Sequence, residues 1–234
     1  MDNKRIINYL NAIAKNNTRE WFRANKAEYD IVRRDFERGV EQALARIVSF
    51  DPSIAHIRVK DATYRFNRDT RFSPDKSPYK RYFGAYIAAH GKKALHGGYY
   101  LHIEPGNSML SVGNYWLPTN ILNSCRNELM ANIDEWRSIV EDSEFVRLFG
   151  RAGETTWLDT GRSGFGSEHL KSCPAGFPRD YEHITYLRMK DYCAWHVVPD
   201  TFYDGDEWLD YMEHVFRVGK PMMDFMNAVI DDYE

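Results

Sequence analysis

Hydrophobic residues in the N-terminal quarter of the chain recur at the spacing of an α-helix. A first run occupies residues 6–14, and a second run with the same spacing occupies residues 21–47. Because one face of an α-helix repeats every 3.6 residues, each run predicts an amphipathic helix. Asn17 followed by Glu20 resembles a capping box, which indicates the start of the second helix, and the Asp-Pro pair after this run indicates its end.

Between residues 57 and 116 the hydrophobic pattern changes to a period of two, which is typical of half-buried β-strands. Turn-forming residues separate the apolar stretches, and a Pro-Gly-Asn sequence joins the last two of them as a predicted hairpin. The pattern therefore predicts short strands within residues 59–66, 82–88, 99–104 and 109–112.

The strand at residues 99–104 has two different faces, because alternate side chains of a β-strand point to opposite sides of the sheet. The apolar face, which we expect in the core, consists of Tyr99, Leu101 and Ile103. The polar face, which could line a cleft, consists of Tyr100, His102 and Glu104.

The second half of the chain predicts further helices and one more strand. Their positions are a helix at residues 119–133 capped by Thr119, a helix at 135–149, an irregular surface segment at 150–180, a strand at 192–198, and C-terminal helices broken or kinked at Pro221. We therefore expect an α+β protein with a helical N-terminal segment, a central, mostly antiparallel sheet and C-terminal helices. No repeat or linker divides the sequence, which favours a single domain over residues 1–234.

Composition narrows the class of protein further. Hydrophobic residues make up 43% of the chain and aromatic residues 15%, more aromatic side chains than a disordered chain carries. No stretch approaches the roughly 20 apolar residues that a membrane helix needs. The three cysteines are far apart and odd in number, and the first residues lack the apolar run of a signal peptide, so we expect a cytoplasmic protein without a disulfide framework.

The net charge of −3 argues against general electrostatic capture of nucleic acid, but the charge is unevenly distributed. Residues 58–81 contain eight Lys or Arg and three Asp, interleaved with aromatic residues and prolines. Guanidinium groups bind phosphate or carboxylate in a forked geometry, and ammonium groups add point charge. We therefore expect this segment to bind an anionic, phosphorylated small ligand. The candidate ligand-binding residues are Arg65, Arg68, Arg71, Lys76, Tyr79, Lys80 and His102.

Other interpretations of the same segment stay open. Asp69 and Asp75 could pair with neighbouring cations in an ion network that only fixes the loop, as in an interaction or scaffold protein. An enzyme would use Asp69, Asp75 or Glu104 as a general base, although the sequence pattern identifies no pair of nucleophile and base. Weak nucleic-acid binding is a third possibility. His102 and Glu104 alone are a weak metal signal, so we predict no metal and no cofactor.

The run FNRDTRFSPDKSPYKRYFGAYI, at residues 66–87, resembles the signature of the DUF2461 proteins, a conserved bacterial and fungal family of unknown function. The segments KNNTREWFRANKAEYD, GGYYLHIEPGNSMLSVGNYWLP and CPAGFPRDYEHITYLRMKDY are similar to the same family pattern. The resemblance covers nearly the whole chain and implies a single α+β domain, with no established activity. It also makes further residues second-tier candidates for the site, namely Arg19, Trp21, Lys26 and Lys190.

The excess of cations in the segment leads to one specific expectation. Cations held close together without enough carboxylates repel one another, so some positive charge should stay unpaired in the fold. We expect a concave basic site lined by at least two of Arg65, Arg68, Arg71 and Lys80. Its aromatic wall would come from Tyr79, Tyr100 or Trp21.

Overall fold

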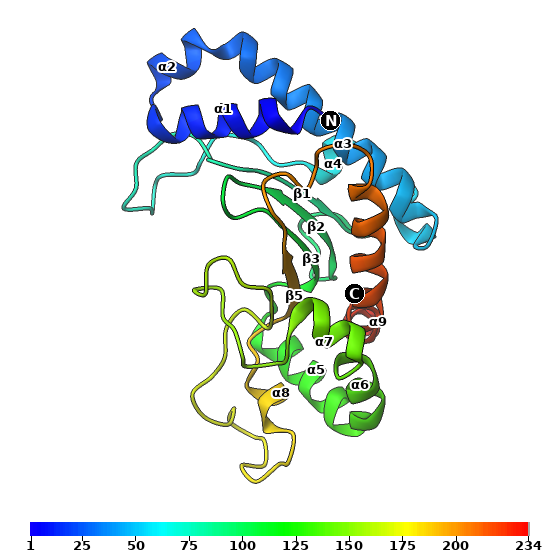
Figure 1. Ribbon diagram of the computed structural model, residues 1–234. Coiled ribbons are helices and arrows are strands. Elements are labelled where there is room, and N and C mark those ends of the chain that lie inside the picture. Colours follow the sequence, from blue (N-terminus) through cyan, green and yellow to red (C-terminus); the bar gives the residue numbers. More distant parts are fainter. Residues whose placement is uncertain (234) are drawn as a thin grey trace. The chain divides into compact units, whose positions relative to one another are not determined.

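The computed structural model describes residues 1–233 and has the expected α+β architecture (Figure 1). Five strands form one antiparallel sheet in the order β1-β2-β3-β5-β4. The strands are β1 (Phe83–Ile87), β2 (Gly98–Ile103), β3 (Met109–Asn114), β4 (Gly164–Phe165) and β5 (Tyr192–Val197). The predicted fold class is therefore confirmed.

Helices precede the sheet in sequence, lie in the connections from the third to the fourth and from the fourth to the fifth strand, and form the C-terminal part of the described chain. They are α1 (Asn3–Lys15), α2 (Arg19–Ala24), α3 (Lys26–Val48), the 3-10 turn η1 (Pro52–Ile54), α4 (Val59–Ala62), α5 (Thr119–Ala131), α6 (Ile133–Val140), α7 (Ser143–Phe149), α8 (Ile184–Arg188) and α9 (Trp208–Asp231). Contacts group the chain into two compact units. The first comprises residues 1–92, 100–109 and 198–213, and the second comprises 93–99, 110–197 and the described residues from 214 onward. One domain over residues 1–234 stays a prediction.

The first predicted helix is confirmed as α1, whose Asp2 side chain accepts a hydrogen bond from the Arg5 backbone N–H at 3.1 Å. The second predicted helix is two helices, because the chain breaks at Asn25 between α2 and α3. Its predicted cap was also wrong: Thr18, the residue after Asn17, caps α2. The Asn17 side chain instead binds the backbone of a residue far along the chain, as described below.

The core of the first unit is largely aromatic. The buried face of α3 carries Phe36, whose ring lies 5.1 Å from that of Phe83 on β1. Phe66 lies at the same distance from Phe83 and also contacts Tyr29 of α3. Aromatic pairs at these distances add to the free energy gained from burying the rings. This core holds the segment around residue 66 firmly against α3 and β1.

The predicted strand at residues 59–66 was wrong. Residues 59–62 form the short helix α4, because Asp61 reaches back to its N-cap, Arg58, and bonds both its backbone and its side chain. Both bonds run from Arg58 to the Asp61 carboxylate, so the backbone N–H of Arg58 has a local acceptor and is not available to a neighbouring strand. Beyond the helix, two isolated β-bridges take the place of the predicted strand, Thr63 to Ala85 and Asn67 to Tyr79.

The hairpin and the two-faced strand that follow match the prediction. Tyr99, Leu101 and Ile103 of β2 are at most 2% exposed, so this face is core. At the predicted turn, Gly106 has a φ of 74°, a left-handed conformation that glycine adopts without a steric penalty. The Asn107 N–H donates to the Glu104 carbonyl at 2.9 Å and closes the turn.

The second unit packs around Trp136 of α6. Its ring lies 5.5 Å from Tyr192 of β5 and 5.3 Å from Phe225 of α9. β5 confirms the predicted strand at 192–198, and the segment predicted as irregular contributes β4, which pairs with it. The predicted helix at 135–149 is two helices, α6 and α7, because Asp142 caps the start of α7.

Two details of the helices differ from the sequence prediction. Thr119 is the first residue of α5, not its cap, and Pro118 precedes the helix without a side-chain cap. The predicted break at Pro221 was wrong, because one helix, α9, runs through Pro221, while a kink at this position stays a prediction. Pro221 is exposed, so the carbonyl that lost its partner can be solvated, which lets the helix continue. None of the helices in the described residues has a stretch long and apolar enough to cross a membrane.

Candidate functional site

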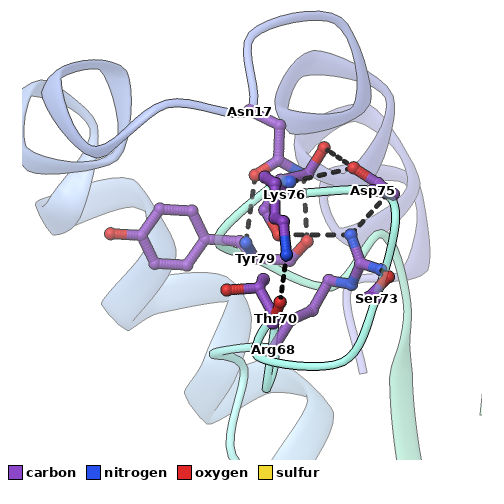
Figure 2. A network of polar contacts seen from close by, with 8 residues as sticks. Asn17, Arg68, Thr70, Ser73, Asp75, Lys76 and Tyr79 are labelled. Atoms are coloured by element: carbon purple, nitrogen blue, oxygen red, sulfur yellow. Dashed lines mark hydrogen bonds and ion pairs between the residues drawn. The ribbon is translucent and has the colours of Figure 1, made fainter.

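The charged loop, residues 67–80, is closed at its base by backbone pairing. The Arg68 N–H donates to the Pro78 carbonyl and the Lys80 N–H donates to the Phe66 carbonyl, both at 2.9 Å. Asn17 then binds both backbone groups of Tyr79, accepting from its N–H at 3.0 Å and donating to its carbonyl at 2.9 Å (Figure 2). The segment between α1 and α2 therefore fixes one end of the loop.

Inside the loop, Arg68 and Asp75 form the centre of a polar network (Figure 2). The Arg68 guanidinium lies 2.5 Å from the Asp75 carboxylate and also donates to Ser73 Oγ and the Ser77 carbonyl. Asp75 accepts from the Ser77 N–H at 2.8 Å and from Ser77 Oγ at 2.6 Å. The hydrogen bonds from Ser77, together with Arg68, lower the pKa of Asp75 to about 2. These groups satisfy one another within the loop.

Two further cations of the loop, Arg71 and Lys76, also have partners, but at its surface. Arg71 binds Asp69 through two nitrogens at 2.7 and 3.0 Å, and the Lys76 ammonium donates to the Thr70 carbonyl at 3.0 Å. The Arg71 side chain is 77% exposed. The structure thus places Arg68, Arg71 and Lys76, and with them the candidate bases Asp69 and Asp75, in contacts that stabilise the loop.

Lys80 has a different environment. Its half-buried ammonium group lies over the rings of Tyr64 and Tyr82, at 5.0 and 5.3 Å from their centroids. Among the described residues, no hydrogen bond or ion pair joins it to a carboxylate. Burial lowers the pKa of Lys80, and the positive charges of Arg65, Arg33 and Lys92 lower it further.

Lys80 and the three cations that lower its pKa form a group that we call the Tyr64 cluster, after the ring over which Lys80 and Lys92 lie. Its members are Lys80, Lys92, Arg65 and Arg33. Lys92 lies 5.4 Å from the Tyr64 ring and donates to the Thr63 carbonyl. Arg33, on α3, donates to the Tyr64 carbonyl at 2.8 Å and pairs with Glu37. Arg65 is exposed, and within residues 1–233 it has no ion pair. The cluster therefore holds more positive charge than its neighbours neutralise.

The polar face of β2 continues from this cluster. The Tyr82 ring, which contacts Lys80, lies 4.6 Å from the ring of His102. His102 Nδ1 lies 2.9 Å from the Tyr100 hydroxyl, and its Nε2 lies 3.2 Å from Glu104 Oε2. Because a carboxylate can only accept, His102 donates from Nε2 to Glu104, and a neutral imidazole then accepts the Tyr100 hydroxyl proton at Nδ1.

Glu104 is held as a carboxylate in this chain. Burial alone would raise its pKa, but hydrogen bonds from His102 and Asn107 outweigh that effect, so the pKa of Glu104 lies below its ordinary value. Asn107 donates to Oε2 at 2.9 Å, the same oxygen that His102 contacts. Oε1 has no partner among the described residues, so one oxygen of a half-buried carboxylate is available. Burial raises the pKa of Tyr100 well above its ordinary value, which keeps its hydroxyl protonated.

The other predicted residues lie elsewhere. Tyr79 is buried and stacks on Phe22 with ring centroids 4.1 Å apart, and Trp21 packs on Tyr9 in the same aromatic cluster. The second-tier residues are distributed as follows: Arg19 is exposed on α2, Lys26 pairs with Asp30 on α3, and Lys190 pairs with Glu168 at 2.7 Å in the second unit.

Sequence reasoning missed four members of the site: Arg33, Lys92, Tyr82 and Tyr64, the last of which was expected only on a strand. Arg33 lies on α3 and Lys92 follows β1, both outside the charged segment, so nothing local to the segment identifies them. Tyr82 was assigned only to a strand, although its position two residues after Lys80 in an extended segment would have put both side chains on one face.

Comparison with protein-family models adds one identification. The model described as conserved hypothetical protein (DUF2461) matches residues 5–225, which is nearly the whole chain. The chain therefore belongs to the DUF2461 family, as its sequence motifs predicted. Neither the comparison with curated proteins nor the comparison with solved structures found a match.

Proposed function

We propose that this DUF2461 protein binds an anionic, phosphorylated small molecule at the Tyr64 cluster. The observation that carries the proposal is Lys80, a half-buried cation that has three positive neighbours and no carboxylate partner among residues 1–233. Holding like charges together costs free energy, and a multiply charged anion would recover it. The anion would contact Lys80, Lys92 and Arg65. Arg33 already bonds Tyr64 and Glu37, so it would attract the anion only through its charge.

The aromatic rings support a ligand with more than a phosphate group. Tyr64 and Tyr82 flank Lys80, so an anion bound there would lie beside two half-buried rings. Such rings favour an organic portion that can lie against them. The ligand class that fits is therefore a phosphorylated organic molecule. Arg68 and Arg71 would contribute by fixing the loop that ends at Lys80, whereas Lys76 makes only an exposed contact to the Thr70 carbonyl.

The experiment compares anion binding by the unmodified protein and by two matched lysine variants. Inorganic phosphate and pyrophosphate are titrated by calorimetry and by thermal unfolding, with sodium chloride at equal ionic strength as the reference. We expect both phosphates to raise the melting temperature, because a ligand that binds only the native state stabilises it. Lys80→Met should weaken phosphate binding roughly tenfold or more, the cost of losing a hydrogen bond to a charged group. Lys76→Met, which removes a lysine from the loop network, should retain it.

Equal responses to phosphate and chloride in the unmodified protein would contradict the proposal. So would equal losses of affinity in the two variants, since the proposal assigns binding to Lys80 and only a loop contact to Lys76. Both variants can be checked for folding by their thermal transitions without ligand.

Hydrolysis or transfer at the same place is a second candidate function, favoured by the Tyr100–His102–Glu104 chain. The unpartnered Oε1 of Glu104 could take the proton of a water or hydroxyl group that attacks the ligand, with the cations stabilising the charge that develops. p-Nitrophenyl phosphate is a direct probe. Glu104→Gln should abolish its turnover while leaving phosphate binding intact, and an unmodified protein without any turnover of this and related esters would exclude this candidate.

The paired charges of the loop favour a third candidate, an interaction or scaffold protein in which the loop only maintains the fold. Arg68 with Asp75 and Arg71 with Asp69 are the observations behind it. This candidate predicts no specific response to phosphate, so the titrations above distinguish it from the first.

A further inference from the structure

The second unit contains a buried cation without a counter-ion. Arg126 lies on α5 and is only 3% exposed. Among the described residues, no carboxylate forms an ion pair with it. Charged side chains are almost never fully buried without a partner, because removing the charge from water costs several kcal/mol. Burial accordingly lowers the pKa of the Arg126 guanidinium.

The hydrogen bonds of Arg126 are also incomplete. Nη1 donates to Asn123 Oδ1 at 2.8 Å and Nη2 donates to the Met189 carbonyl at 2.9 Å. The Nε atom is buried and has no acceptor within residues 1–233. A guanidinium has five N–H donors, and here two of them are used. The neutral partners orient the group but leave its charge and three donors for another molecule.

A short surface segment covers this group. The ring of Phe177 lies 5.9 Å from the guanidinium carbon of Arg126, and Cys173 is close enough to affect its pKa. Between them the chain passes through Gly176, which has a φ of 87° and is exposed. Residues 173–178 therefore run from the solvent-exposed surface to the buried guanidinium.

We propose that Arg126 is the centre of a binding site for a small monocarboxylate, distinct from the Tyr64 cluster. A carboxylate matches the forked geometry of a guanidinium, and its single negative charge neutralises the single positive charge of Arg126. A phosphate dianion would leave a net negative charge among Phe177, Cys125 and Tyr192, which offer no second cation. The ligand enters when the 173–178 segment moves aside, and this segment then covers it.

Cys173 provides a direct readout of that segment. It is half-buried, whereas Cys125 is 0% and Cys193 is 5% exposed, so a neutral alkylating reagent should modify Cys173 first. The experiment follows alkylation of Cys173 by iodoacetamide, using mass spectrometry, in sodium acetate and in sodium chloride at equal ionic strength. We expect acetate to slow alkylation saturably, by roughly tenfold at ten times its dissociation constant, because the bound form opens less often.

Two arginine variants complete the test. Arg126→Met should remove the acetate effect, while Arg179→Met, the same change at an exposed arginine just beyond the segment, should retain it. The proposal would be overturned if chloride slowed the alkylation of Cys173 as much as acetate does. It would also be overturned if acetate still slowed alkylation in Arg126→Met. If Arg126→Met does not fold, the unmodified protein alone tests the proposal. An alkylation rate of Cys173 that does not depend on acetate would overturn it, because only water would then contact the free donors of Arg126. Lys80→Met should not change the acetate effect, which keeps this site separate from the first.

Discussion

The charged loop and two members of the Tyr64 cluster, Arg65 and Lys80, belong to the same basic stretch of sequence, yet the charges of the loop and of the cluster have opposite environments. In the loop, each arginine has a carboxylate close to it in sequence, and the contacts of Arg68 and Arg71 are complete. In the cluster, Lys80 lies among other cations and has two aromatic rings as its nearest partners. Charges that satisfy one another stabilise a fold, whereas charges left unpaired indicate a place where something else binds.

The largest effect in this comparison should come from releasing the base of the loop. Asn17→Ala removes both side-chain bonds to the Tyr79 backbone and leaves a partly buried N–H and carbonyl without partners. At roughly 1–3 kcal/mol for each of the two unpaired groups, we expect a loss of about 2–6 kcal/mol in the free energy of unfolding. Urea denaturation measures it. Asn16→Ala is a suitable control, because Asn16 is exposed and bonds only within its own helix end; similar losses in both variants would contradict the assignment.

A smaller loss should follow from removing the centre of the loop network. Arg68→Met breaks the contacts to Asp75, Ser73 and Ser77, and we expect about 1 kcal/mol, since the pair is only partly shielded from solvent. Arg71→Met breaks a more exposed pair and should cost less than half of that. Each variant carries a single arginine-to-methionine substitution, so their denaturation midpoints can be compared directly. Equal midpoints would mean that Arg68 contributes no more than a surface charge.

The pH dependence of stability offers a separate test of the network. Asp75 has a pKa of about 2 in the folded protein and an ordinary value of 3.8 when unfolded. Because the unfolded chain takes up the proton first, the stabilisation from this carboxylate is complete above pH 3.8 and is lost as the pH falls toward 2. Asp75→Asn should therefore be less stable than the parent protein at pH 6, and the two should converge near pH 2. A constant difference across this range would show that the carboxylate is not involved.

The smallest effect on stability should come from the cluster itself. Lys80→Met removes a charge whose pKa is lowered by burial and by neighbouring cations, so we expect no loss of stability at pH 7 and a slight gain. The sign of the pH dependence follows: the parent protein should recover stability relative to Lys80→Met as the pH rises through the lowered pKa toward 10.5. Thermal unfolding at pH 7 and pH 10 measures both. A clear destabilisation at pH 7 would make Lys80 a structural residue.

Local patterns predicted much of this fold. The apolar face of β2 and the hairpin after it depend on neighbours in sequence, and the structure has both. The pattern misled at Asn17, whose side chain could have capped a helix but binds Tyr79 instead, and at residues 59–62, where Asp61 caps a helix that the two-residue period did not suggest. In each case a specific hydrogen bond outweighed a general preference.

The site was less accessible to sequence reasoning than the fold. Arg68 and Asp75 are only seven residues apart, and the sequence predicts their pairing as one of its alternatives, the ion network that fixes the loop. The isolation of Lys80 depends on Arg33 and Lys92, which come from other elements and are brought near it only by the tertiary structure. A count of charges shows that cations exceed carboxylates, but not which cation remains unpaired.

The contact between Asn17 and Tyr79 also bears on the order in which the protein folds. It joins residues 62 positions apart, so it cannot form until the chain between them has collapsed. The loop that it closes should therefore become ordered late, after α1 and α3 have packed on the aromatic core. A contact absent from the folding transition state changes the unfolding rate and leaves the folding rate nearly unaltered. Stopped-flow kinetics of Asn17→Ala should accordingly show faster unfolding with an unchanged folding limb, and the loop should be the first part of this unit to exchange its amide hydrogens.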